Sequence, residues 1–104
     1  MRLILTTCPP DHAERIARAL VEEGRAACVS ATPVRSCYRW QGRLCVEEEV
    51  TLFIKVATEE AAALRDRLRA LHPYEVPEIV ALPIDEAASH APYLDWVRQA
   101  TKTQ

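Results

Sequence analysis

The segment LHPYEVPEIVALPI, residues 71–84, contains a histidine, a tyrosine and two glutamates, side chains that can bind metals or transfer protons. His72 supplies an imidazole that can bind copper or zinc or transfer a proton, and Glu75 and Glu78 supply carboxylates that could act with it as an acid–base pair. Two of its three prolines, Pro73 and Pro77, remove backbone donors and stiffen an extended path. The segment is therefore a candidate metal site, a candidate acid–base site or a rigid connector bordering a cleft, and we interpret it first as a connector.

A metal site in this chain would use His72, with Cys8 or Glu78 as a partial ligand. Neutral imidazole suits copper or zinc, and thiolate suits softer ions. His72 and Cys8 both stand at the ends of predicted elements beside the sheet. No two of these residues have the spacing of a diagnostic metal motif, so metal binding at His72, Cys8 and Glu78 is a hypothesis that the spacing does not decide.

The composition and motifs favour a binding protein over an enzyme. The chain has two glycines, and it contains no Gly-rich phosphate loop, no nucleophile elbow and no HExxH motif, so we predict no catalytic residues and no required cofactor. A net charge of −2 with interspersed signs predicts no nucleic-acid partner. No apolar run approaches the ~18 residues of a membrane span. We expect a cytoplasmic protein.

The 104 residues predict one domain that spans residues 1–104. Hydrophobic periodicity alternates between strand and helix, and we expect the tail after Thr101 to fray. The capping signals are Asp11 with Glu14 for the first helix and Thr58 for the second. The predicted elements are a strand at 2–7, a helix from Asp11 to Gly24, a strand at 26–40 interrupted at Pro33, a strand at 44–56, a helix from Thr58 to about His72, a strand at 78–84 and a helix from Pro92 whose Tyr93, Trp96, Val97 and Ala100 share a face.

This order of elements, two strand–helix–strand halves followed by an extra helix, predicts an α+β fold. The expected architecture is a ferredoxin-like sandwich, βαββαβ, with both main helices on one face of an antiparallel sheet.

The two long strands predict a β-hairpin around Gln41-Gly42. With a two-residue loop, Trp40 faces Arg43, and Arg35 faces Glu48, the one charged residue on an otherwise apolar strand face. A bulge near Pro33 would spoil this pairing.

The four cysteines, at positions 8, 28, 37 and 45, lack zinc-site spacing and are interpreted as free thiols. The hairpin register places Cys37 and Cys45 on opposite faces, so we predict no disulfide between them.

The hairpin is too long for one chain to shelter. A helix of about 13 residues is ~20 Å long, whereas the 14 residues from Arg43 to Val56 extend ~46 Å. The projecting part carries Tyr38, Trp40, Leu44 and Val46, which would expose aromatic and aliphatic surface unless another subunit covers it. We therefore expect a closed homo-oligomer; the alternative is a shorter, bent hairpin.

Five blocks resemble the divalent-cation tolerance family, CutA. They are AACVS at 26–30, SCYRWQGRL at 36–44, EEEVTLFIKV at 47–56, HPYEVPEIVALPI at 72–84 and YLDWV at 93–97. The resemblance implies a ferredoxin-like protomer, a homotrimer built by long hairpins, a likeness to PII signalling trimers, and tolerance of copper and other divalent cations. It also implies a Cu(II) site, from which this chain departs: Cys8 is displaced by one residue, and Leu71 precedes His72 where a second histidine is expected.

Two functional hypotheses follow. The first is a cytoplasmic homotrimer that binds a divalent metal, copper first, through His72, Cys8 and Glu78. The second is a PII-like regulatory or scaffolding trimer that binds a small molecule or a protein at its intersubunit clefts. The candidate contacts for the second are aromatic and charged side chains of the hairpin and connector, which are favoured anchors in such clefts: Tyr38, Arg39, Trp40, Tyr74 and Glu75.

Overall fold

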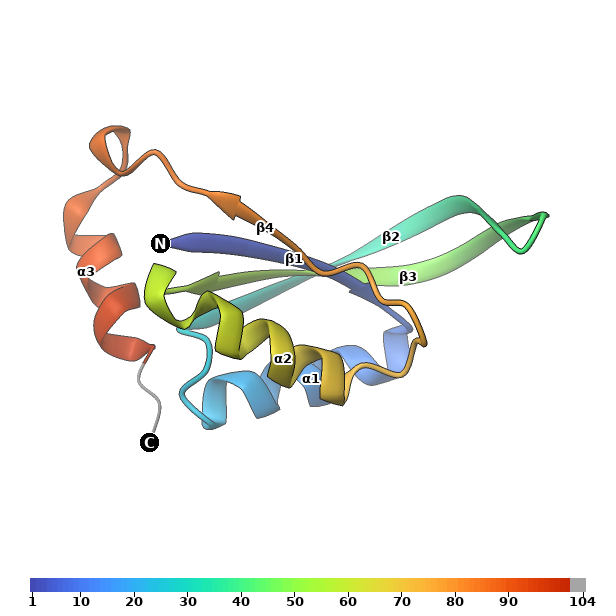
Figure 1. Ribbon diagram of the computed structural model, residues 1–104, viewed down its shortest axis with the longest axis horizontal. Helices are drawn as coiled ribbons and strands as arrows, with labels where there is room; N and C mark the ends of the chain where they lie inside the picture. Colours follow the sequence, from blue (N-terminus) through green and yellow to red (C-terminus); the bar gives the residue numbers. More distant parts are fainter. Residues whose placement is uncertain (102–104) are drawn as a thin grey trace.

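The computed structural model describes residues 1–101 as a four-stranded antiparallel sheet with three helices (Figure 1). The strand order is β2-β3-β1-β4, which confirms the predicted α+β, ferredoxin-like fold. The expectation for the tail concerns residues 102–104, outside the described part. The elements are β1 (Arg2–Cys8), α1 (Pro10–Glu22), β2 (Cys28–Trp40), β3 (Arg43–Val56), the short 3-10 turn η1 (Thr58–Glu60), α2 (Ala61–Leu71), β4 (Val80–Pro83), a second 3-10 turn η2 (Glu86–Ala88) and α3 (Ala91–Ala100).

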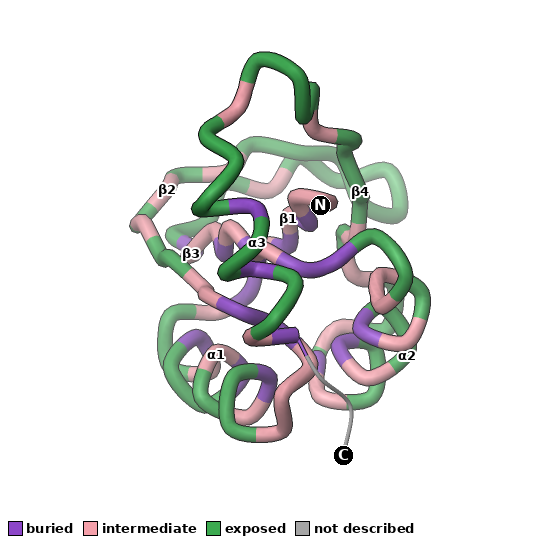
Figure 2. The backbone as a smooth tube through the Cα atoms, turned by 90° about the vertical axis from the view of Figure 1, so that its left-hand side faces the viewer, coloured by how far each residue is buried: buried purple, intermediate pink, exposed green. Residues whose placement is uncertain are grey.

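The core lies between α1 and α2 and one face of the sheet (Figure 2). Helix positions three or four apart face the same side, and alternate strand positions do likewise, so each element contributes one apolar row. The helix rows are Ile16 with Leu20 and Leu64 with Leu68, and the facing strand rows include Ile4, Leu52 and Ile54. No helix within residues 1–101 is both long and apolar enough to cross a bilayer.

Both predicted helix caps are wrong. The first helix begins at Pro10 with Pro9 in the N-cap position, because proline fits the first turn, where its missing donor has no partner to lose. Asp11 therefore lies inside the first turn, where its charge favours the positive end of the helix dipole. Thr58 lies in the 3-10 turn before α2, and its hydroxyl oxygen accepts from the Met1 amino group at 2.8 Å.

The β2–β3 hairpin has the predicted register from Trp40 opposite Arg43 back to Cys28 opposite Lys55. Pro33 pairs in the same register, so the possible bulge is absent from this described hairpin. Arg35 Nη2 and Glu48 Oε1 are 3.1 Å apart, which confirms the cross-strand ion pair. All four cysteines are free thiols, as predicted.

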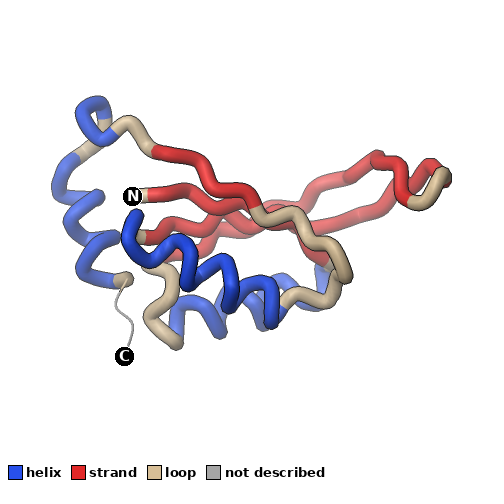
Figure 3. The backbone as a smooth tube through the Cα atoms, viewed as in Figure 1, coloured by secondary structure: helices blue, strands red, loops and turns tan. Residues whose placement is uncertain are grey.

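The outer part of the hairpin has no third strand beside it, because β1 ends at Cys8 opposite Val50 (Figure 3). Apolar side chains on both faces of this ribbon are exposed: Tyr38 by 37% and Trp40 by 44% on one face, Leu44 by 68% and Val46 by 60% on the other. The expected exposed surface is therefore present on the protomer.

β4 is shorter than the predicted strand at 78–84. It pairs with β1 only from Val80 opposite Leu5 to Pro83 opposite Arg2, where β1 begins. The side chain of Glu78 still reaches the same strand, because its Oε1 accepts a 3.3 Å hydrogen bond from the Thr7 hydroxyl.

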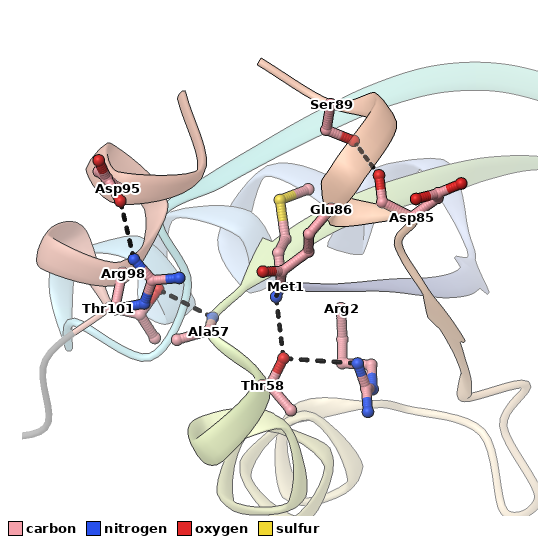
Figure 4. A network of polar contacts seen from close by, with 10 residues as sticks. All are labelled: Met1, Arg2, Ala57, Thr58, Asp85, Glu86, Ser89, Asp95, Arg98 and Thr101. Carbon is pink, nitrogen blue, oxygen red and sulfur yellow. Dashed lines mark hydrogen bonds and ion pairs between the residues drawn. The ribbon is translucent and has the colours of Figure 1, made fainter. Parts of the chain in front are cut away.

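α3 packs across the end of the sheet rather than joining the other helices (Figure 1). Its buried residues are Leu94 and Val97, whereas Tyr93 and Trp96 are exposed with ring centroids 5.7 Å apart. Of the residues predicted to share one face of this helix, Val97 packs against the protein, whereas Tyr93 and Trp96 do not. A polar network ties this end together (Figure 4): the Thr101 hydroxyl accepts from Ala57 N at 3.3 Å, and the Met1 amino group donates to Glu86 at 2.6 Å.

Candidate functional site

The connector between α2 and β4 passes around the carboxyl end of β1 (Figure 3). α2 ends at Leu71 and His72 is already extended, with ψ 135°, because the following Pro73 disfavours a helical conformation in the residue before it. The predicted end of this helix is confirmed. The extended path then carries Tyr74, Glu75 and Glu78 past the base of the hairpin.

His72 is buried, and both of its ring nitrogens are hydrogen-bonded. Nδ1 accepts from the Tyr74 backbone N–H at 3.2 Å, so the proton is on Nε2, which donates to the Thr7 carbonyl at 3.0 Å. Burial lowers the pKa of His72, with the Thr7 carbonyl acting in the opposite direction. The arrangement holds a neutral imidazole that joins the connector to β1.

Tyr74 lies beside His72 and reaches across to β3. Its hydroxyl donates a 2.5 Å hydrogen bond to Glu49 Oε2, and Glu49 is only 6% exposed. Burial, followed by this hydrogen bond, raises the pKa of Tyr74 well above its usual value. A carboxylate in the middle of a long strand is thus drawn into the site by a connector residue 25 positions away.

Cys8 ends β1 and is fully buried. Burial, and then the nearby Glu49 carboxylate, raises the pKa of the Cys8 thiol. Both effects favour the protonated thiol over the thiolate that binds metals and acts as a nucleophile.

Two of the three predicted metal ligands, His72 and Glu78, lie at the end of β1, whereas the Cys8 side chain belongs to the core on the helix side of the sheet. His72 and Glu78 both hydrogen-bond to Thr7, the residue before Cys8. However, His72 has no free ring nitrogen and Cys8 is a buried thiol, so this donor set does not fit a metal ion in the observed conformation. Within residues 1–101 no group of three or more His, Cys, Asp or Glu side chains is arranged to hold one.

A pocket of about 670 Å³ lies between the hairpin and the connector. Four of the five predicted cleft contacts line it, namely Tyr38, Trp40, Tyr74 and Glu75. Arg39 does not, because strand alternation places it on the opposite face from its two neighbours. Partial burial and the Glu47 carboxylate raise the pKa of Tyr38 to about 12. The other lining residues are Thr7, Ser36, Cys37, Glu49, Pro73, Val76 and Glu78.

Glu49 is the site residue that the sequence analysis missed. Its strand alternation places it with Glu47 on the polar side, which is the usual pattern of a solvated strand face. Only the path of the connector, which brings Tyr74 to it, reveals that it is buried, and no local sequence signal carries that information.

The fold and pocket define the class of protein: a ferredoxin-like sandwich with a long projecting hairpin, of the PII-like kind. Residues 2–100 match the family model described as CutA1 divalent ion tolerance protein. The chain is 48% identical over 101 residues to the divalent-cation tolerance protein CutA of Thermus thermophilus, covering 95% of this chain and 96% of that protein. It is 44% identical over 99 residues to human protein CutA; this covers 93% of the chain but only 54% of the human protein.

Solved structures agree with this assignment. One described as the PII-like protein CutA from Nostoc sp. PCC 7120 in apo form superposes with a TM-score of 0.97 at 48% identity, covering 100% of both chains. One described as the periplasmic divalent cation tolerance protein CutA from Archaeoglobus fulgidus has a TM-score of 0.90 at 35% identity, covering 98% of this chain and 100% of that one. The chain belongs to the CutA1 divalent ion tolerance family, which is described by tolerance and not by a reaction.

Proposed function

We propose that this protein is a homotrimer that binds a small ligand in the pocket between hairpin and connector, as a PII-like regulatory or scaffolding protein. The observation that carries the proposal is the pocket of about 670 Å³, which is within the range of small-molecule sites. The Nostoc relative is itself described as PII-like.

The sheet face opposite α1 and α2 supports the oligomer. Ile4 and Ile54 face the helices, so Leu3, Leu5 and Phe53 lie on the other face. β4 adds Val80 and Leu82 to this open face, and both are more than two-fifths exposed. Together with the exposed hairpin, this apolar surface fits a second and third copy of the chain, because it is of the kind that monomers rarely expose.

A ligand screen tests the pocket. Nucleotides and metabolites are added to the wild type and to two variants, Trp40→Ala in the pocket and Trp96→Ala on α3, and the unfolding temperature is measured. A ligand of the pocket should raise Tm in the wild type and in Trp96→Ala but not in Trp40→Ala, since binding to the folded state stabilises it. A screen without any such compound would contradict the proposal.

Divalent-metal binding, with copper as the first candidate, is the second function that we propose for testing. The observation that favours it is that His72 and Glu78 both hydrogen-bond to Thr7, the residue before Cys8, although the donor set does not fit a metal ion in the observed conformation. Binding there requires His72 to give up one of its two hydrogen bonds.

Titration with Cu(II) separates the two functions. His72→Gln keeps a hydrogen-bond donor and an acceptor on its amide but removes the imidazole ligand. It should therefore weaken the binding of Cu(II) at least tenfold, which is about 1.4 kcal/mol. His90→Gln, on an exposed side chain, is the matched control. Equal copper affinities in the wild type and His72→Gln would remove His72 from any metal site.

We propose the cytoplasm as the location and a binding role without catalysis. The four free thiols suit a reducing compartment. The Archaeoglobus relative is described as periplasmic, so cell fractionation is the direct test. Recovery of the protein in a periplasmic extract would contradict the proposed location.

A further inference from the structure

Glu49 is a buried carboxylate without a cation. It is 6% exposed, it accepts a hydrogen bond from Tyr74, and it forms no ion pair with any residue in the range 1–101. A buried charge is costly unless an opposite charge accompanies it. Its other side is the pocket, which Glu49 lines. Within this fold, a cation that compensates the Glu49 carboxylate can therefore bind only from the pocket side.

The rest of the pocket makes the imbalance larger. Glu75 and Glu78 also line it, and no Lys or Arg of the described chain does. Arg39, between Tyr38 and Trp40, lies on the opposite face of the strand, and Arg43, opposite Trp40 across the hairpin, is not among the lining residues. Two further Arg side chains are engaged elsewhere: Arg35 pairs with Glu48, and Arg15 donates to the Leu71 carbonyl at 3.1 Å. Three carboxylates without a basic side chain in a partly enclosed cavity produce a field that concentrates cations.

The remaining walls select the kind of cation. Tyr38, Trp40 and Tyr74 place aromatic rings along the same pocket. Ring faces attract ammonium groups, and Trp and Tyr are the strongest of the aromatic side chains in this interaction. A metal ion is a poorer fit, because no group of three His, Cys, Asp or Glu side chains in the described residues is arranged to coordinate one.

We propose that the ligand of this pocket is an organic ammonium ion, held by the Glu49, Glu75 and Glu78 carboxylates and by the faces of the aromatic rings. This inference rests on the proposed ligand-binding function and names its ligand class. The volume, about 670 Å³, accommodates an aliphatic diamine, whose two positive charges match the acidic lining of the pocket. Anionic ligands such as nucleotides are disfavoured at this site by like-charge repulsion.

The test uses three four-carbon probes that differ in charge: 1,4-diaminobutane, 1,4-butanediol and succinate. Trp40 lines the pocket, and the chain has only two tryptophans, so Trp96→Phe leaves Trp40 as the sole indole reporter. We expect diaminobutane to change Trp40 fluorescence with a Kd at least tenfold lower than that of butanediol, and succinate to give no response. Calcium chloride is added as a fourth probe. It tests whether any cation is attracted to the acidic pocket, regardless of its chemical class.

Two charge-removing variants locate the effect. Glu49→Gln keeps an acceptor for Tyr74, and Glu75→Gln changes an exposed side chain whose loss cannot unfold the core. Each substitution should raise the Kd for diaminobutane about tenfold. Glu22→Gln, on the exposed face of α1, should leave this Kd unchanged.

The outcomes distinguish this inference from the function on which it rests. Binding of butanediol or succinate as tight as that of diaminobutane, or an equal response to calcium, overturns the ammonium assignment while the ligand pocket stands. A basic side chain from a second copy that already fills the site would also overturn the ammonium assignment, because diaminobutane would then bind no more tightly than butanediol. If no probe responds and the metabolite screen is also blank, both proposals fall.

Discussion

Tyr74 and His72 connect three parts of the chain through single hydrogen bonds. The Tyr74 hydroxyl reaches Glu49 on β3, and the His72 ring bridges Thr7 on β1 and the Tyr74 backbone. Because Glu49 and His72 are buried, each lost bond leaves a polar atom without water to replace the partner. The wall of the pocket is therefore sensitive to single atoms at these positions.

Removal of the Tyr74 hydroxyl should destabilise the fold. Tyr74→Phe leaves the Glu49 carboxylate without its donor, and we expect a loss of about 1–3 kcal/mol in the free energy of unfolding, measured by urea denaturation. The matched control is Tyr93→Phe, because the Tyr93 hydroxyl has no hydrogen bond among the described residues. An equal and small effect of both substitutions would show that the Tyr74–Glu49 bond adds nothing.

The acid dependence of stability should report on His72. Its pKa is lowered by burial, so the unfolded chain takes up the proton more readily than the folded one. The contribution of neutral His72 to the free energy of unfolding is fully present above pH ~6.5, the ordinary pKa of histidine in an unfolded chain. This contribution is lost as the pH falls from there through the lower pKa of His72 in the folded protein. Urea midpoints between pH 7 and 5 should fall more steeply in the wild type than in His72→Gln, and His90→Gln should follow the wild type. Parallel profiles for all three proteins would contradict this.

At the scale of elements, the hairpin depends on its turn. Gln41 has φ 51° and Gly42 has φ 76°, so both central residues are in the left-handed region that a type I′ turn requires. Glycine adopts this conformation freely, whereas glutamine does so at a cost. The turn is thus compatible with the twist of the strands but is not built from the most favourable residues.

Two opposite substitutions test the turn. Gln41→Asn should stabilise the hairpin by roughly 0.5 kcal/mol, since asparagine tolerates a positive φ. Gly42→Ala should destabilise it by about 1 kcal/mol through backbone strain alone, because a Cβ there would meet nothing within 4 Å. Amide exchange along β2 and β3 measures both effects. Protection that changes in the same direction for the two variants would refute the turn assignment.

At the scale of the whole molecule, the open sheet face and the hairpin ribbon both carry uncovered apolar side chains. The two main helices, α1 and α2, cover only one face of the sheet (Figure 1). The ribbon carries exposed apolar side chains on both of its faces, Tyr38 and Trp40 on one and Leu44 and Val46 on the other. This asymmetry is the physical basis of the proposed trimer, and we expect its contacts to involve β4 and the hairpin.

Charge substitution on the open face should dissociate the proposed trimer. Leu82→Lys puts an ammonium group on β4, and light scattering should then fall from three times the chain mass of 11.7 kDa to that of one chain. Val21→Lys is the matched control: Val21 is 43% exposed and lies on α1, away from the open face. A wild type that already has the mass of a single chain would refute the trimer, and an unchanged mass for Leu82→Lys would place the interface elsewhere.

Much of the fold followed from the sequence because its signals are local. The hairpin register needed only the two-residue turn and the alternation of apolar positions, which brought Arg35 opposite Glu48. The helix caps failed because Asp11 and Thr58 satisfy the local pattern, but proline and the Met1 amino group compete with it. The placement of α3 across the end of the sheet also depends on a surface that forms only on folding.

For the site, the sequence determined which side chains occur near the connector, because their order along the chain fixes where α2 ends and where the hairpin begins. Tyr38, Trp40, Tyr74 and Glu75 could be proposed as contacts because aromatic and charged side chains are favoured anchors in clefts, and all four line the pocket. Tertiary structure alone decided that Glu49 is buried and that His72 has both nitrogens engaged. Burial and hydrogen-bond partners are set by chain segments distant in sequence, and a pattern of neighbouring residues contains no record of them.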